Sequence, residues 1–165
     1  AQPGNIEGFV PGTLSFDSIA WNHPRAADIL VDANWTDALN TEGYRGFTTS
    51  TGVAGHGSTS PFDIHIRLIA DGPDIADGIV SPVPTGNIDL APTICSLLGI
   101  ERPTSMRGRV LSELFPDGPV PESVTVQAET RTVSAENGYH LELKTSQVGQ
   151  TIYIDSTRVT RHAGQ

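Results

Sequence analysis

Three stretches near the C-terminus decide the fold: Val-Thr-Val-Gln at 124–127, Tyr-His-Leu-Glu-Leu-Lys-Thr at 139–145 and Thr-Ile-Tyr-Ile-Asp at 151–155. Apolar and polar residues alternate in each of them, which is typical of β-strands with one buried and one solvated face. Asn137-Gly138 is a strong hairpin signal, and Val148-Gly149-Gln150 supplies a second turn. We therefore predict an antiparallel β meander over residues 123–161.

Upstream of the meander, the clearest helix is predicted over Asp89–Leu98. Asp89 is a good N-cap residue, Pro92 is tolerated in the first turn, and Gly99 suits the position after the helix. Further elements are predicted as a second helix over 109–115, a helix or turn beginning at Ser60-Pro61, and short strands over 27–31, 64–68 and 78–81. Together with the meander, these elements predict an α/β fold.

Composition limits the class of protein. The chain has 165 residues, of which 37% are hydrophobic and 18% charged, enough for one sizeable domain with a core. Its net charge of −9 argues against binding nucleic acid or anionic lipid through charge. No apolar run reaches the ~18 residues of a membrane span, so we expect none in this segment. The single cysteine, Cys95, lies in an apolar run and is predicted to be buried and inert.

The glycine-rich loop at residues 50–61, which contains Gly55-His56-Gly57-Ser58, is the strongest candidate for chemistry. Glycines allow the backbone to approach a ligand closely, and a histidine between two of them can present a ring nitrogen to a metal. His56 is only one ligand, however, and a metal site needs three or four. His65 lies in strand-like alternation and fits a residue that supports a ligand, or a packing residue, better than a ligand.

Other polar residues have structural interpretations that we prefer. Asp89 is explained as a helix cap, and the hydroxyls of Ser58 and Thr59 suit turn formation better than substrate contact. Asn34-Trp35-Thr36 matches a glycosylation sequon, a triplet that often arises by chance. Three acidic residues are predicted to form a solvated turn rather than a calcium site, because the glycine and glutamate of an EF-hand are missing: Asp71, Asp74 and Asp77. His23, His140 and His162 lack a ligand-like context.

An ordered set of motifs extends from this loop towards the C-terminus: Gly55-His56-Gly57-Ser58, Ser60-Pro61, the segments 68–74, 87–93 and 97–103, and Met106-Arg107-Gly108-Arg109. In this order they resemble the C-terminal part of the alkaline phosphatase superfamily, in the type I phosphodiesterase/nucleotide pyrophosphatase and sulfatase-like branch. The resemblance covers roughly residues 50–115. Where the family often has Met-Asp-Gly, this chain has Met106-Arg107-Gly108.

The resemblance implies the C-terminal part of an alkaline-phosphatase-like α/β/α sandwich over residues 1–122, with the meander of 123–165 packed on it. It also implies a hydrolase of phosphate or sulfate esters with two divalent metals, commonly zinc, and a Ser or Thr nucleophile. In this family the histidine of the late His-Gly loop is a metal ligand, a role that falls on His56. The nucleophile and the other ligands lie upstream in the family; Asp28, Asp32 and Asp37 do not match them.

The chain alone is therefore predicted to be inactive. The expected partners are the N-terminal portion of the same protein or an oligomeric partner, with a phosphate-ester small molecule as substrate of the complete enzyme. The family favours an extracellular, periplasmic or cell-surface location. Because the chain begins Ala-Gln-Pro-Gly, without Met or a signal-peptide pattern, we expect either that a leader was removed or that the chain is an internal piece of a longer protein. Two alternatives stay open: a non-catalytic interaction or structural module, and an unrelated small acidic binding domain.

Overall fold

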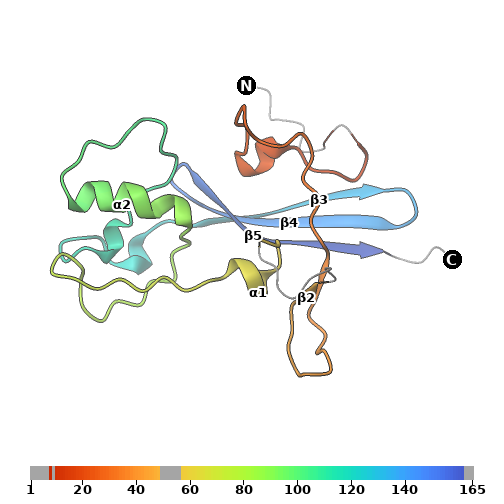
Figure 1. The fold of residues 1–165 in the computed structure, drawn as a ribbon, viewed down its shortest axis with the longest axis horizontal. Helices are drawn as coiled ribbons and strands as arrows, with labels where there is room; N and C mark the ends of the chain where they lie inside the picture. The colour runs from red at the N-terminus through yellow and green to blue at the C-terminus, as the bar shows by residue number, and fades with distance from the viewer. Residues whose placement is uncertain (1–7, 9, 49–56, 162–165) are drawn as a thin grey trace. The chain divides into compact units, whose positions relative to one another are not determined.

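The computed structural model describes residues 8, 10–48 and 57–161 (Figure 1). Its largest regular element is a three-stranded antiparallel sheet of β3 (Gln127–Ala135), β4 (Tyr139–Val148) and β5 (Thr151–Arg161), in the order β3-β4-β5. Asn137 and Gly138, in the three-residue connection between β3 and β4, have φ angles of 61° and 67°, the left-handed conformation that tight hairpin turns use. The predicted meander is confirmed, although its first strand begins at residue 127 rather than 124.

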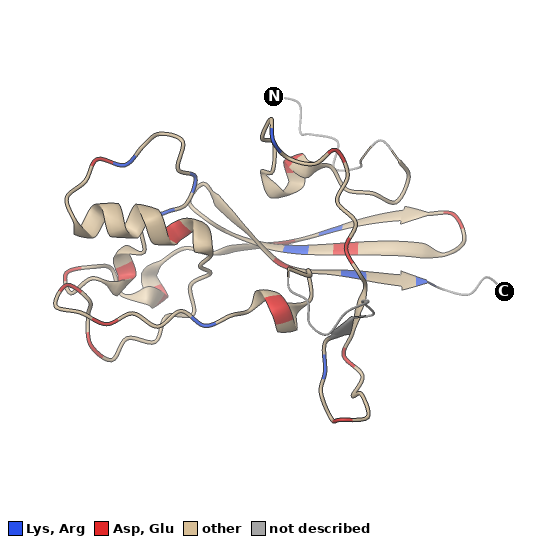
Figure 2. Cartoon of the chain, viewed as in Figure 1, with Lys and Arg blue, Asp and Glu red and all other residues tan. Residues whose placement is uncertain are grey.

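The predicted helix before the meander is also confirmed, as α2 (Leu90–Leu97). Gly99 follows it with a φ of 63°, which a glycine adopts at little cost. α2 carries no charged side chain (Figure 2). The remaining elements are short: α1 (Pro61–Ile64), β1 (Trp35–Thr36) paired antiparallel with β2 (Phe47–Thr48), and the 3-10 turns η1 (Phe16–Ile19), η2 (Asn87–Asp89), η3 (Ser112–Leu114) and η4 (Pro121–Ser123).

The three predicted upstream strands, over 27–31, 64–68 and 78–81, were wrong. All three segments are irregular apart from the end of α1, and apart from the half-buried Ile64 their large apolar residues are exposed, with Val31 at 87% and Ile66 at 72%. Alternation of residue types does not make a strand unless another strand lies alongside to accept its backbone hydrogen bonds. The only strand pairs among the described residues are β1-β2 and those of the meander.

Backbone contacts divide the chain into two compact units. Unit 1 comprises residues 1–66, 129–145 and 154–165, and unit 2 comprises residues 67–128 and 146–153. The core of unit 2 is a cluster of Val83, Val148 and Tyr153, with the half-buried Val124 packed against it. The mixed α/β character is confirmed, whereas the α/β/α sandwich and the domain boundary between 122 and 123 stay predictions. Among the residues described, no helix is both long and apolar enough to cross a membrane.

Candidate functional site

The described end of the glycine-rich loop, residues 57–60, is fixed by the first turn of α1. Ser60 is buried, and its Oγ accepts a hydrogen bond from the Phe62 N–H at 3.3 Å, so Ser60 caps the helix as the Ser-Pro pair predicts. The Asp63 carboxylate, one turn further on, accepts from the Ser58 N–H at 2.7 Å. The two bonds tie the loop to α1 on both sides of Thr59.

Thr59 connects the same loop to two distant segments of unit 1. Its N–H donates to the Asp32 carboxylate at 2.5 Å, and its hydroxyl donates to the same carboxylate. The Thr157 hydroxyl of β5 lies 2.5 Å from the Thr59 hydroxyl, and the Thr157 N–H donates to the Thr59 carbonyl at 3.1 Å. Residues 58–60 are therefore held from three directions, which is the rigidity that a ligand-presenting loop needs.

Of the two predicted site residues, only His65 is described, because His56 lies outside the described residues. His65 forms the C-cap of α1, where its N–H donates to the Pro61 carbonyl at 3.2 Å, and its side chain is exposed. No group of three or more His, Cys, Asp and Glu in the described ranges is arranged to hold a metal.

The structural interpretations of the loop hydroxyls and of the acidic turn agree with what the structure describes. The Ser58 hydroxyl accepts from the Ser60 N–H at 3.3 Å, and the Thr59 hydroxyl binds Asp32. The acidic residues Asp71, Asp74 and Asp77 are exposed. Cys95 is a free thiol that is half-buried rather than buried, because it lies between the buried and the exposed faces of α2.

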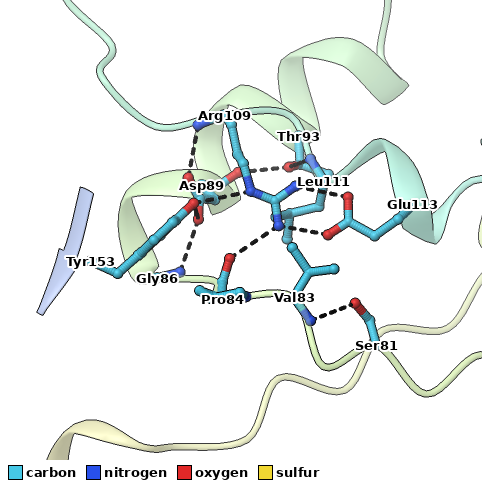
Figure 3. A network of polar contacts seen from close by, with 10 residues as sticks. All are labelled: Ser81, Val83, Pro84, Gly86, Asp89, Thr93, Arg109, Leu111, Glu113 and Tyr153. Carbon is cyan, nitrogen blue, oxygen red and sulfur yellow. Dashed lines mark hydrogen bonds and ion pairs between the residues drawn. The ribbon is translucent and has the colours of Figure 1, made fainter. Parts of the chain in front are cut away.

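A second polar cluster, inside unit 2, was not predicted. Asp89 is completely buried, and its carboxylate accepts three hydrogen bonds: from the Gly86 N–H at 2.9 Å, the Arg109 N–H at 2.8 Å and the Tyr153 hydroxyl at 2.9 Å (Figure 3). It occupies the N-cap position of α2 but makes no side-chain bond to the helix N–H groups. Asp89 thus does not act as the N-cap of α2. As the last residue of η2, it accepts from the N–H of Gly86, the N-cap of η2, so the predicted capping role is confirmed in the form of a capping-box bond. The same carboxylate also binds residue 109 and β5.

The Arg109 side chain joins this cluster to a buried acid. Its Nη1 and Nη2 donate to the two oxygens of Glu113 at 2.8 and 2.6 Å, its Nε donates to the Tyr153 hydroxyl at 3.0 Å, and its Nη2 also donates to the Pro84 carbonyl at 3.1 Å. The Glu113 side chain is only 1% exposed. A bidentate pair of this kind is the strongest geometry open to an arginine and a carboxylate.

The pKa values show how the members of the cluster depend on one another. Burial alone would lower the pKa of Arg109, but its hydrogen bonds and charge attraction with Glu113, and its bond to Tyr153, raise it. Burial alone would raise the pKa of Glu113, yet the hydrogen bonds from Arg109 lower it below its ordinary value. Burial, and then the bond to Asp89, raise the pKa of the Tyr153 hydroxyl. The cluster thus keeps its ion pair charged and its phenol neutral.

This cluster is better suited to holding unit 2 together than to chemistry. Asp89 already accepts three hydrogen bonds, and both oxygens of Glu113 are bound by one guanidinium. The hydroxyl of Thr93 extends the network by donating to the Asp89 carbonyl at 2.7 Å and accepting from the Leu111 N–H at 3.0 Å. A sequence signal did exist, because Arg109 and Glu113 are spaced i,i+4, but nothing local connects them with Tyr153, which lies 44 residues after Arg109.

A shallow hollow of about 470 Å³ lies elsewhere on unit 2. It is formed by the end of α2 and the turn after η3, and its lining residues are Asp74, Ser96, Leu97, Ser112, Phe115, Pro116, Asp117, Gly118 and Pro119. Its two carboxylates, Asp74 and Asp117, are both exposed to solvent. Since no charged residue of its lining is buried, the hollow does not form a second candidate site.

No protein-family model matches the chain, and no solved structure matches it. The resemblance to the alkaline phosphatase superfamily therefore depends on the ordered sequence motifs alone.

Proposed function

We propose that this chain is the C-terminal part of a metal-dependent phosphodiesterase/nucleotide pyrophosphatase-like hydrolase of phosphate or sulfate esters. The observation that carries the proposal is the ordered motif set that begins at the His-Gly loop. The geometry of that loop supports it, since residues 58–60 are anchored by Asp32, Asp63 and Thr157. A loop with so many anchors suits the precise placement of a neighbouring side chain.

In the complete enzyme His56 would supply one metal ligand, and the family's two divalent ions, commonly zinc, would neutralise charge on the transferred group. The described residues contain no further cluster of donors, so the nucleophile and the remaining ligands would come from upstream sequence. The part played by the described residues is positional: Asp32 and Asp63 fix the two residues that follow Gly57.

The first prediction is that His56→Ala, in the protein that includes the upstream sequence, removes one bound metal ion and the esterase activity together. Ligation requires the neutral imidazole, so the wild-type metal affinity should fall as the pH drops through the titration range of histidine. Bound metal is counted by elemental analysis of the purified protein, and activity is measured on a nitrophenyl phosphodiester, a phosphomonoester and a sulfate ester.

His65→Ala is the matched control, because His65 is exposed and caps α1 only through its backbone. It should keep both metals and most of the activity. Retention of both metals and normal turnover by His56→Ala would contradict the proposal. So would metal-dependent turnover by the isolated 165-residue chain, which has no identifiable nucleophile.

We propose further that an apolar surface of the upstream portion, or of an oligomeric partner, covers α2. The helix buries Pro92 and Thr93 but leaves Ile94 53% exposed, and its C-cap residue Leu98 is 66% exposed. An amphipathic helix normally buries its more apolar face. Together with the lack of charge on α2, this is what the core of a protein–protein interface presents.

The second prediction follows from that exposure. The isolated chain should associate with itself, and replacing Ile94 and Leu98 by Asp should reduce the association without unfolding unit 2, because neither side chain belongs to its buried core. Light scattering after size-exclusion chromatography measures the mass, and circular dichroism measures the fold. A monomeric wild-type chain that does not bind a hydrophobic dye would contradict the proposed covered face.

The alternative, a non-catalytic interaction module, is favoured by the same exposed face. The experiment on His56 decides between the two. If the protein is an interaction module, His56→Ala should change neither its metal content nor any esterase activity. Self-association of the isolated chain does not separate the two functions, because both predict it.

A further inference from the structure

β5 is an edge strand in the order of the sheet, yet part of its outer edge is already occupied. Residues 157 and 159 are two apart and therefore direct their backbone groups to the same side of the strand. The Thr157 N–H donates to the Thr59 carbonyl at 3.1 Å, and the Thr157 carbonyl accepts from the Trp35 indole at 2.5 Å. The backbone N–H and carbonyl of Val159 are both hydrogen-bonded to the Asn34 side chain.

The Asn34 side chain forms a closed pair of hydrogen bonds with Val159. Its Nδ2 donates to the Val159 carbonyl at 3.0 Å, and its Oδ1 accepts from the Val159 N–H at 3.1 Å. The amide thus acts as a neighbouring strand would. The strand residue between Thr157 and Val159 also contacts the segment that follows Asn34: the Arg158 guanidinium lies 5.2 Å from the centre of the Trp35 ring and donates to Asp37 at 3.4 Å.

This pair uses one particular hydrogen of the amide. To donate to and accept from the same residue, Asn34 must use the N–H on the same side of its C–N bond as its oxygen. An N-linked sugar converts the side chain into a secondary amide, which, like a peptide bond, keeps its remaining N–H opposite the oxygen. The reverse arrangement costs about 2.5 kcal/mol. The sugar would therefore occupy the position in which Val159 now accepts its bond.

We infer that Asn34 closes the outer edge of β5 and that its sequon, Asn34-Trp35-Thr36, does not carry a glycan in the folded chain. Asn34, the residue that would be glycosylated in this triplet, is the residue whose side chain takes the place of a neighbouring strand beside Val159. This inference is independent of the proposed hydrolase function, because it uses no residue of the metal site.

Asn40 offers a matched control within the β1-β2 hairpin. Its Oδ1 accepts from the Glu42 and Tyr44 N–H groups at 3.1 and 2.8 Å, and the described contacts include no bond from its nitrogen. Glu42→Thr turns Asn40 into a sequon, and a sugar on its nitrogen would leave both existing bonds intact. The Glu42→Thr chain is expressed in a eukaryotic secretory host. Its folded, secreted fraction is purified, digested and analysed by peptide mass spectrometry. We expect a glycan at Asn40 and none at Asn34.

If the chain is secreted poorly, thermal unfolding of protein made in bacteria tests the role of Asn34 instead. Asn34→Asp keeps an acceptor but loses the donor to Val159, whereas Asn40→Asp keeps everything that Asn40 uses. In bacterial protein, Asn34→Asp should lower the thermal midpoint monitored by tryptophan fluorescence, and Asn40→Asp should leave it unchanged. A glycan at Asn34 in protein with the wild-type midpoint would overturn the inference, as would equal midpoints for the two Asp variants.

Discussion

Replacing Arg109 by alanine is expected to lower the free energy of unfolding by about 3–5 kcal/mol, because it leaves the Glu113 carboxylate buried without its partner. It also removes the donor to Tyr153 and the bond to the Pro84 carbonyl. Arg109→Lys should recover only part of the loss, since an ammonium cannot make the bidentate bond. Urea unfolding followed by circular dichroism measures both effects.

The control is Arg131→Ala, which breaks a pair of the same chemistry in an exposed place. Arg131 binds Glu129 through two nitrogens on β3, but the Glu129 side chain is 55% exposed. An exposed pair contributes about 0–1 kcal/mol. If Arg109→Ala costs no more than Arg131→Ala, the buried cluster does not stabilise the chain as we describe.

The same ion pair sets a pH dependence whose direction follows from the pKa of Glu113. Because the folded-state pKa of Glu113 is lowered, its contribution to stability is fully present above the pKa of the unfolded chain. That contribution is lost as the pH falls through the folded-state value. Glu113→Gln, which cannot titrate, should therefore show less loss of stability in acid than the wild type, although it starts from a lower stability at neutral pH.

The elements that were predicted correctly are those whose signals are local. The meander follows from alternation and from Asn137-Gly138, whose two positive φ angles the hairpin requires. The helix α2 follows from its flanking residues, with Gly99 shortly after its last residue, Leu97. The helix α1 follows from Ser60-Pro61. In each case the residues that decide the conformation lie within a few positions of one another, so the sequence alone contains the information.

The predicted helix over 109–115 shows why the rest was missed. Only η3, at residues 112–114, is helical there. The N–H groups of Arg109 and Leu111 donate to the side chains of Asp89 and Thr93, which lie about twenty residues earlier in the chain. The helical residue propensities of 109–115 were thus outweighed by hydrogen bonds to a distant segment, and no periodicity within the window reports such bonds.

In the candidate site, too, the features that were predicted are local in sequence, and those that were missed are not. The glycine-rich loop was found by its composition, and its anchors at Asp63 and Ser60 lie close to it in sequence. Its other anchors, Asp32 and Thr157, lie 27 and 98 residues from Thr59, and in the sequence Asp32 was considered only as a possible metal ligand, a role that does not match the family. Its carboxylate instead accepts both donors of Thr59, so a residue set aside by motif has a clear structural role.

Gly108 is singled out by the motif Met106-Arg107-Gly108, and the structure supplies a physical reason for the glycine. Gly108 is buried, and a Cβ atom at this position would lie 2.0 Å from the carbonyl oxygen of Ile88 and 2.9 Å from the Asp89 nitrogen. Both are backbone atoms of η2, which cannot rotate away as a side chain can. The close approach of these two backbones is also what brings the Arg109 N–H within 2.8 Å of the Asp89 carboxylate.

Gly108→Ala is therefore expected to destabilise the chain by about 3 kcal/mol or more, since it adds overpacking to the loss of a buried hydrogen bond. Gly86→Ala is the matched control in the same unit: its Cβ would meet the Tyr153 ring at 3.5 Å, an ordinary contact, and its φ of −145° suits any residue. Urea unfolding should show a large loss for Gly108→Ala and a small change for Gly86→Ala. Equal stability of the two variants would mean that the backbone of residue 108 does not lie against η2. The glycine would then need another explanation, because only the close approach to Ile88 makes alanine unacceptable there.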